Sequence, residues 1–311
     1  MDWDKLRVFL AVAEAGSFTR AGKVLNLSQS AVSRQISGLE EMLKVSLFHR
    51  HARGLVLTEQ GEEFYRTVQE MAARLALAQA RINESRERPE GPLRITTTVA
   101  FGTAWLTTRM NKFLALYPDI HVSLVLIDSE ELDLSLGQAD VAIRFAPQTQ
   151  PNLIQRQLMS IRYHVFAAPK YLKEHGTPER PEDLDAHAII IYGEDAPAPI
   201  EDMNWLLEAG AKPGTRREPA LTVNNVYGIC RAVQSGLGIG ALPYYMSSEA
   251  TNLVEILPDL HGPGFNAFFV YSEELRHSKR IAVVRDFLVQ EVAEDEFARA
   301  ERRSRLGVRA V

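Results

Sequence analysis

One uninterrupted stretch predicts a single long helix, which separates a short N-terminal segment from a much longer C-terminal one. Residues 62–88 contain neither proline nor glycine, Thr58 can cap the start, and Pro89 and Gly91 end the pattern. A helix over residues 59–90 would be about 45 Å long at roughly 1.5 Å per residue. Its apolar residues alternate spacings of four and three, at Phe64, Val68, Met71, Leu75, Ala78 and Ile82.

This alternation is the a/d pattern of a coiled coil, so it predicts that two copies of the chain pair through the helix. The alternative is an ordinary amphipathic helix packed against its own domain, because the pattern spans only a few turns. A homodimer is the interpretation that also suits the segment before the helix.

Residues 1–58 carry three helical patterns joined by short turns. Leu6, Phe9, Leu10 and Ala13 recur at helical spacing, and Gly16 ends that pattern. Ser17 and Ser28 can each cap a following helix. Two helices joined by so short a turn predict a helix-turn-helix, a module that usually needs a two-fold partner to bind DNA half-sites.

The third of these helices has one apolar stripe, formed by Val32, Ile36, Leu39 and Leu43, and an opposite face of short hydroxyls. Small side chains allow close approach to the major groove, Arg34 can donate to guanine or phosphate, and Gln29 can pair with adenine. The alternative, a merely solvated face, usually shows Glu and Lys instead. The predicted contacts to double-stranded promoter DNA are Ser28, Gln29, Ser30, Ser33, Arg34, Ser37, Arg50 and Arg53.

Arg50 and Arg53 belong to a basic turn between two strand-like runs in residues 47–58, which predicts a wing that contacts phosphates. Residues 17–58 contain six Lys or Arg and two Glu, a local net charge of +4. Because the whole chain has a net charge of −5, the remaining residues carry −9. This asymmetry is expected when one part binds nucleic acid, although it also fits a chance cluster. His49 and His51 alternate like a metal pair but have no third ligand nearby, and no metal site is expected.

The motifs Gly16-Ser17-Phe18-Thr19-Arg20-Ala21, Leu27-Ser28-Gln29-Ser30-Ala31-Val32-Ser33-Arg34 and Leu57-Thr58-Glu59-Gln60-Gly61 resemble the winged helix-turn-helix of LysR-type transcriptional regulators. The resemblance implies a dimer through the linker helix and, commonly, a homotetramer. One departure is Lys44, where that family commonly has glycine. A left-handed backbone there would strain lysine by roughly 1 kcal/mol.

From residue 93 the sequence alternates short β-rich runs with helical ones, which predicts an α/β domain with mostly parallel strands. We expect a final helix over about residues 278–303. Ligands bind beyond the C-terminal ends of such strands, where helix N-termini present unpaired N–H groups to anions. The predicted strands are residues 93–98, 122–127, 141–145, 163–167, 188–192, 221–223, 237–242 and 267–271.

Residues 93–95, 139–143 and 232–243 are similar to the effector domain of the LysR family, which implies two subdomains like those of a periplasmic binding protein. The implied domains are 1–58, 59–90 and 91–311, the last divided into subdomain I (about 91–162 and 266–311) and subdomain II (about 163–265). A small effector of unknown identity would lie between them. Carried over by position, its contacts are Thr98, Ala100, Phe101, Arg144, Tyr192, Asn224 and Asn225.

Several of these residues also have purely structural interpretations. Thr98 fits an ordinary strand residue, Arg144 a salt-bridge partner, and the two asparagines a helix cap. Ala100 lacks the hydroxyl that family members often carry, while Arg144 and a helix N-terminus favour an anionic effector.

Two other function classes have weaker support. A solute-binding protein would use the same C-terminal fold, but residues 1–5 lack a secretion signal, and this predicts a cytoplasmic protein. An enzyme is not expected, because there is no Gly-x-Ser-x-Gly elbow, zinc-type His/Glu spacing or phosphate-loop lysine, and no cofactor is predicted. Gly236, Gly238 and Gly240 fit close packing better than a nucleotide loop. The single cysteine, Cys230, fits a buried apolar residue and a reducing compartment.

Overall fold

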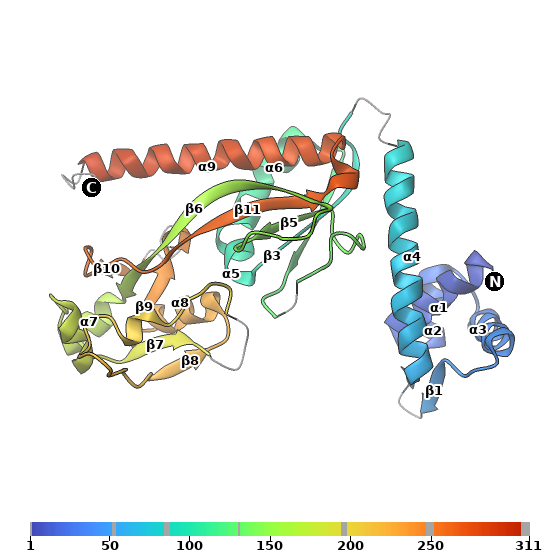
Figure 1. Ribbon diagram of the computed structural model, residues 1–311, viewed down its shortest axis with the longest axis horizontal. Coiled ribbons are helices and arrows are strands. Elements are labelled where there is room, and N and C mark those ends of the chain that lie inside the picture. Colours follow the sequence, from blue (N-terminus) through green and yellow to red (C-terminus); the bar gives the residue numbers. More distant parts are fainter. Residues whose placement is uncertain are drawn as a thin grey trace. The chain divides into compact units, whose positions relative to one another are not determined.

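The computed structural model describes residues 2–51, 54–83, 88–129, 131–193, 198–246 and 252–305 (Figure 1). The chain forms two compact units, Met1–Ala80 and Arg81–Val311. The predicted domain boundaries at residues 58 and 90 stay predictions.

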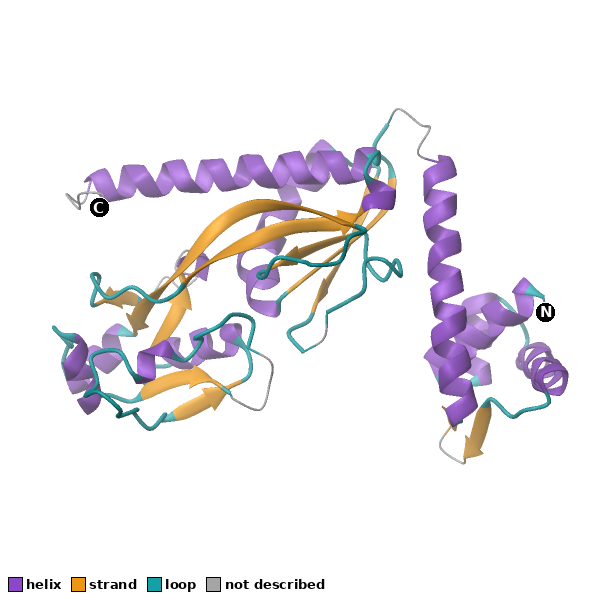
Figure 2. Cartoon of the chain, viewed as in Figure 1, coloured by secondary structure: helices purple, strands orange, loops and turns teal. Residues whose placement is uncertain are grey.

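The N-terminal unit contains three short helices, a two-stranded hairpin and a long helix (Figure 2). The first helices are α1 (Trp3–Ala15), α2 (Phe18–Leu25) and α3 (Gln29–Leu43). The hairpin strands β1 (Phe48–His51) and β2 (Gly54–Leu57) pair antiparallel, and α4 spans Glu59–Asn83. The side chains of Ser17 and Ser28 accept hydrogen bonds from backbone N–H groups in the first turns of α2 and α3. The predicted helix-turn-helix and wing are therefore present.

The core of this unit forms where the predicted apolar stripes meet. Val32, Ile36 and Leu39 of α3 are fully buried. The ring of Phe9 on α1 lies 5.5 Å from Phe48 of the wing and 5.1 Å from Phe64 of α4, measured between centroids. The first turns of α4 thus belong to the core of the same chain, as the alternative interpretation of the long helix expects.

A single sheet runs through the second unit in the order β4-β3-β5-β11-β6-β9-β7-β8, with β10 also paired to β6. One half contains β3 (Gly91–Thr97), β4 (Ile120–Leu126) and β5 (Val141–Arg144). The other half contains β7 (Ile189–Tyr192), β8 (Leu221–Val223), β9 (Ile239–Pro243) and β10 (Val254–Ile256). Two long strands, β6 (Leu153–Ala167) and β11 (Gly264–Ser272), connect the halves.

The expectation of mostly parallel strands is only half right. Parallel pairing joins β3 to β4 and β5, and β7 to β8 and β9. The connecting strands β6 and β11 pair antiparallel with each other and with their neighbours. The first ten residues of β6 were missed because they mix exposed polar and buried apolar positions without a clear period.

Helices cover the sheet in both halves (Figure 1). After β3 the chain forms α5 (Val99–Phe101), a π-helical turn η1 (Gly102–Leu106), η2 (Thr107–Arg109) and α6 (Met110–Leu116). The other half carries α7 (Pro169–His175), η3 (Pro181–Ala186), η4 (Trp205–Leu207), α8 (Val226–Gln234) and η5 (Tyr244–Met246). A short turn η6 (Glu273–Leu275) precedes α9 (Lys279–Arg305), which the sequence predicted within a few residues.

The glycine run near residue 238 is a packing feature. A Cβ atom at Gly238 would lie 2.3 Å from the carbonyl oxygen of Ala188, and one at Gly240 would lie 2.7 Å from Val233. Gly236 has a φ of 78°, which L side chains rarely adopt. These glycines let α8 turn tightly into β9, and Cys230 is buried beside them on α8.

Candidate functional site

The outer face of α3 is open to solvent. Gln29, Ser30, Arg34 and Ser37 are exposed and Ser33 is half-buried. Three of these side chains are short, so they leave room for a close approach, while Arg34 provides a planar donor. This face has the composition and the exposure that a helix in a major groove requires.

Ser28, which is predicted to contact DNA, also has a structural role in α3. Its hydroxyl oxygen accepts a hydrogen bond from the N–H of Ala31 at 3.2 Å and lies 3.1 Å from the hydroxyl of Ser30. Ser28 is therefore the N-cap of α3, and it fixes the end of the helix that carries the other polar residues.

Glu40, which the sequence analysis counted only as a negative charge, connects the end of α3 to the wing. One carboxylate oxygen of Glu40 accepts hydrogen bonds from the N–H groups of Leu47 and Phe48, at 2.8 and 3.3 Å. The hydroxyl of Thr58 donates to the carbonyl of Ser46 and accepts from the N–H of Gly61. Thr58 thus caps α4, as predicted. Arg53 and the side chain of Arg50 lie outside the described residues.

The second candidate site lies in the C-terminal unit, where β3, β4, β7 and β8 end. A cavity of about 280 Å³ there is lined by Val99, Leu126, Ile127, Asp128, Ser129, Tyr192, Asn224 and Asn225. A second, enclosed cavity of about 20 Å³ shares Asp128 and Tyr192 with it. The other residues that line the enclosed cavity are Thr98, Ala100, Phe145, Tyr163, Pro199, Ile200, Val226, Tyr245 and Phe265.

Asp128 joins the two halves of the sheet across these cavities. It follows β4, and one carboxylate oxygen accepts a hydrogen bond from the N–H of Val99 at 2.9 Å. The other oxygen accepts from the side-chain amide of Asn225, whose own oxygen caps α8 by accepting from Gly228. Because β4 and β8 belong to opposite halves, this carboxylate and amide form a bridge between them.

Five of the seven predicted effector contacts line these cavities, and two do not. Thr98, Ala100, Tyr192, Asn224 and Asn225 are lining residues.

The other two, Phe101 and Arg144, line neither cavity, and each has a partner elsewhere. Phe101 is fully buried, with its ring stacked 5.0 Å from Trp105. Arg144 donates to the carbonyl of Leu132 at 2.8 Å and pairs with Glu131 at 3.5 Å. The salt-bridge interpretation of Arg144 therefore agrees with the structure better than its role as an anchor for an anion.

Two tyrosines of the cleft have raised pKa values, mainly because they are buried. Burial raises the pKa of Tyr192, and the charge of Asp128 raises it further. The pKa of Tyr245 is raised well above its ordinary value by burial, and then by the charges of Tyr163, Asp128 and Tyr244. Burial is thus the main cause of both shifts, and Asp128 is the acidic group that adds to it.

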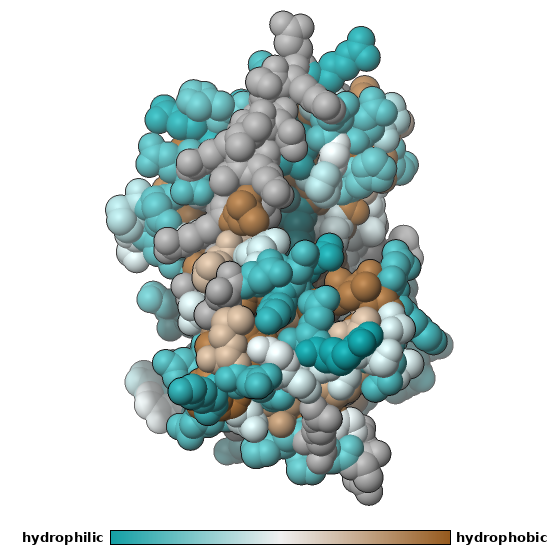
Figure 3. All heavy atoms as spheres, turned by 90° about the vertical axis from the view of Figure 1, so that its right-hand side faces the viewer, coloured by the Kyte–Doolittle hydropathy of each residue, from teal (hydrophilic) through white to brown (hydrophobic). Residues whose placement is uncertain are grey.

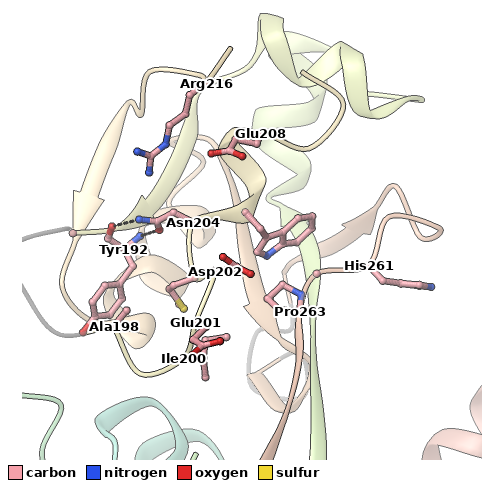
Figure 4. A pocket seen from close by; sticks show the side chains of 14 residues that line it. Tyr192, Ala198, Ile200, Glu201, Asp202, Asn204, Glu208, Arg216, His261 and Pro263 are labelled. Atoms are coloured by element: carbon pink, nitrogen blue, oxygen red, sulfur yellow. Dashed lines mark hydrogen bonds between the residues drawn. The ribbon is translucent and has the colours of Figure 1, made fainter. Parts of the chain in front are cut away.

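A larger hollow of about 880 Å³ also has Tyr192 in its lining (Figure 4). The side-chain amide of Asn204 accepts from the N–H of Tyr192 and donates to its carbonyl, both at 3.0 Å, as the dashed lines show. This pair of hydrogen bonds fixes the end of β7. The charged residues that line the hollow are Glu201, Asp202, Glu208 and Arg216, with His261 beside them.

Sequence comparisons place both units in one family. Residues 3–62 match the family described as "Bacterial regulatory helix-turn-helix protein, lysR family", and residues 86–293 match "LysR substrate binding domain". The chain belongs to the LysR family of transcriptional regulators. It therefore combines a helix-turn-helix DNA-binding domain with an effector-binding domain, and the alternative of a solute-binding protein is not favoured.

Full-length relatives support the same assignment to LysR-type regulators. The chain is 32% identical over 298 residues to the HTH-type transcriptional regulator CrgA of Neisseria meningitidis serogroup C, covering 93% of this chain and 96% of that protein. The solved structure of CrgA matches with a TM-score of 0.58 and 30% identity, over 94% of this chain and 99% of that one. The virulence activator AphB of Vibrio cholerae matches with a TM-score of 0.55 and 26% identity, over 93% and 99% of the two chains. These relatives are named as regulators, not as enzymes.

Some of the a/d residues of α4, through which two copies are predicted to pair, lie on the surface of this LysR-type regulator. Phe64 is half-buried and Val68 is buried in the core of their own unit, whereas Met71 and Leu75 are 47% and 40% exposed. The side chains of Ala78 and Ile82 lie outside the described residues. Hydrophilic residues cover most of the face drawn in Figure 3, with smaller hydrophobic areas between them. Within the described ranges, no helix is both long and apolar enough to span a membrane.

Asp128 is the lining residue of this LysR-type regulator that sequence reasoning most clearly missed. It follows a predicted strand directly, so the rule that sites lie at the carboxyl ends of parallel strands was sufficient to select it. Phe145 is the last residue of another predicted strand and directly follows the observed β5. Tyr163, Tyr245 and Phe265 come from the antiparallel connection and its surroundings, and no local signal marked them.

Proposed function

We propose that this regulator reads promoter DNA with the exposed face of α3. Gln29, Ser30, Ser33, Arg34 and Ser37 would face the base edges, while Arg50 and Arg53 would contact phosphates from the wing. The observation that carries the proposal is the outer face of α3, where short hydroxyls and one arginine are exposed on a helix held at both ends by Ser28 and Glu40.

We further propose that a small effector binds in the cleft at Asp128, and that it shifts the arrangement of paired recognition helices. Such a shift requires the effector to bind one assembly state better than another. The exposed apolar residues Met71 and Leu75 support pairing of two copies through α4, with a tetramer as the further assembly. The protein would act in the cytoplasm, on chromosomal DNA, without an enzymatic activity of its own.

Chromatin immunoprecipitation with the tagged chain tests the proposal. Wild type should give discrete peaks that share a motif with two-fold symmetry, and the double variant Ser33→Ala, Arg34→Ala should lose them. Loss of one bidentate arginine contact alone should weaken operator binding by about 1–3 kcal/mol. Arg7→Ala is the matched control, because Arg7 is an exposed arginine on α1 that pairs with Asp4 in its own helix. Peaks retained by the double variant would show that α3 does not read the operator through this face.

A further inference from the structure

One acidic side chain connects α3 to the wing, residues 47–58. A single carboxylate oxygen of Glu40, Oε1, accepts hydrogen bonds from the backbone N–H groups of Leu47 and Phe48, at 2.8 and 3.3 Å. Leu47 and Phe48 are 1% and 6% exposed, so both N–H groups are largely removed from water. Buried N–H groups need an acceptor, and Glu40 serves two of them.

The position of Glu40 is unfavourable for the helix that carries it. The carbonyl end of a helix has a partial negative charge, so a carboxylate in the last turn is destabilising. α3 ends at Leu43, and Lys44 follows in the left-handed conformation, so Glu40 lies in that last turn. Helix stability therefore does not account for an acid at this position, whereas its two hydrogen bonds to the wing do.

The wing is attached to the other helices by different contacts. The N–H of Leu55 donates to the carbonyl of Gly16, directly after α1, at 3.1 Å. The backbone of α4 passes so close to the carbonyl of Leu47 that no Cβ atom fits at Gly61. In the described part of α3, only Glu40 has a side chain that hydrogen-bonds to the wing. Loss of these two bonds would leave the wing attached to α1 and α4, and would free its angle to α3.

A small change at the base of the wing becomes a large one at its tip. The predicted phosphate contacts Arg50 and Arg53 lie three and six residues after Leu47 in the sequence. β1, Phe48–His51, spans about 13 Å at roughly 3.3 Å per residue. A tilt of about 10° at Leu47 would therefore move the tip by about 2 Å, which is more than a hydrogen bond to a phosphate tolerates.

We infer that Glu40 is a positioning residue, which holds the wing at the angle from which its arginines reach phosphates while α3 contacts bases. The inference rests on the DNA contacts proposed above. Two hydrogen bonds to one oxygen fix both a distance and a direction, because hydrogen bonds are directional and apolar packing is not. Glu40 acts through the wing backbone and needs no contact with DNA of its own.

Two variants of Glu40 separate the reach of the side chain from its charge. Glu40→Asp keeps the carboxylate but is shorter by one carbon, so it no longer reaches both N–H groups. Glu40→Gln keeps the length and one acceptor oxygen but removes the charge. If the hydrogen bonds position the wing, the first variant should be impaired and the second should not. If the charge acts directly on DNA, the order should be reversed.

Operator binding of the full-length chain is measured by fluorescence anisotropy over a range of salt concentrations, on a DNA fragment from a chromatin peak. The slope of log affinity against log salt is about −0.9 for each phosphate contact. In Glu40→Asp this slope should become shallower by about 0.9–1.8 for each wing, with about tenfold weaker binding. Discrimination against a fragment with one mismatched base pair should stay as in wild type, because α3 is unchanged. Glu40→Gln should keep the wild-type slope.

Glu41→Asp is the matched control, because Glu41 is the exposed neighbour of Glu40 in the same turn of α3. It should keep the wild-type slope and affinity. Hydrogen exchange gives a readout without DNA: the Leu47 and Phe48 amides should exchange about tenfold faster in Glu40→Asp, while the α3 amides stay protected.

Three results would overturn the inference. The first is an unchanged salt slope in Glu40→Asp, and the second is an equal loss of slope in Glu41→Asp. The third is a general loss of protection across α3 in Glu40→Asp, which would make Glu40 a residue that stabilises the whole unit.

The double variant Arg50→Ala, Arg53→Ala separates this inference from the function on which it rests. It should lose the same part of the salt slope as Glu40→Asp. A wild-type slope in the double variant would show that the wing does not contact phosphates, and the proposed function would then be wrong in that part. A shallower slope in the double variant but not in Glu40→Asp would leave the DNA contacts standing and refute only the role of Glu40.

Discussion

Lys44 ends α3 at a position where helices usually have glycine. It follows α3 with φ 58° and ψ 27°, the left-handed conformation in which a Cβ atom is unfavourable. Its N–H nevertheless donates to the carbonyl of Glu40, which closes the helix. The sequence predicted strain at Lys44 if its backbone were left-handed, and the backbone is left-handed.

Replacement by glycine should relieve this strain. We expect Lys44→Gly to stabilise the N-terminal unit by about 0.5–1 kcal/mol, because the gain in the folded state exceeds the added freedom of the unfolded chain. Hydrogen exchange of the α3 amides in the full-length chain measures the change. Met42→Gly is the control, since Met42 is an exposed residue inside the same helix, and it should destabilise α3 by roughly 1 kcal/mol. Destabilisation by both substitutions would refute the assignment of strain to position 44.

At the scale of elements, α4 shows two environments along one helix. Its apolar spacing is regular, yet Phe64 and Val68 pack into the core of their own unit, while Met71 and Leu75 are exposed. The sequence pattern gave these residues the same role, because periodicity identifies a face of a helix without saying what covers it. The first turns of α4 therefore agree with packing inside one chain, and pairing of two copies through the exposed turns stays a prediction.

The exposed turns predict the interface between two copies. The double variant Met71→Glu, Leu75→Glu should convert the oligomer to monomers, because paired carboxylates in an apolar seam are desolvated without partners. Sedimentation velocity of the full-length chain measures the mass. Arg66→Glu adds an acidic residue at an exposed position on a different face of α4 and should leave the assembly intact. Unchanged mass in the double variant would place the interface elsewhere.

At the scale of the whole molecule, the bridge between Asp128 and Asn225 connects the two halves of the C-terminal unit. Asn225→Asp keeps the helix cap, because aspartate caps as well as asparagine, but it sets two carboxylates against each other. We expect the bridge to open and protection of the Val99 amide to fall by about 1–2 kcal/mol in hydrogen exchange. Asn224→Asp, one residue earlier, makes the same change in charge beside the bridge between Asp128 and Asn225 and should have a smaller effect.

The sequence alone determined what depends on neighbours along the chain. Helical spacing, caps at Ser17, Ser28 and Thr58, and turns at short intervals were sufficient to predict the winged helix-turn-helix and the long helix after it. The same local signals found most strands of the α/β domain, whereas Thr98, Asn224 and Asn225 were expected at the cleft from the family resemblance. These features are encoded within a few residues, so one sequence contains them.

The tertiary structure decided what depends on pairing between distant segments. The antiparallel course of β6 and β11 brings Tyr163 and Phe265, about a hundred residues apart in sequence, to the lining of one cavity. Arg144 pairs with Glu131, and Asp128 is the charged residue in the described lining of the cleft. Charge and aromatic character are visible in a sequence, but the cavity that a side chain faces is set by strand pairing over long distances, and no local pattern reports that pairing.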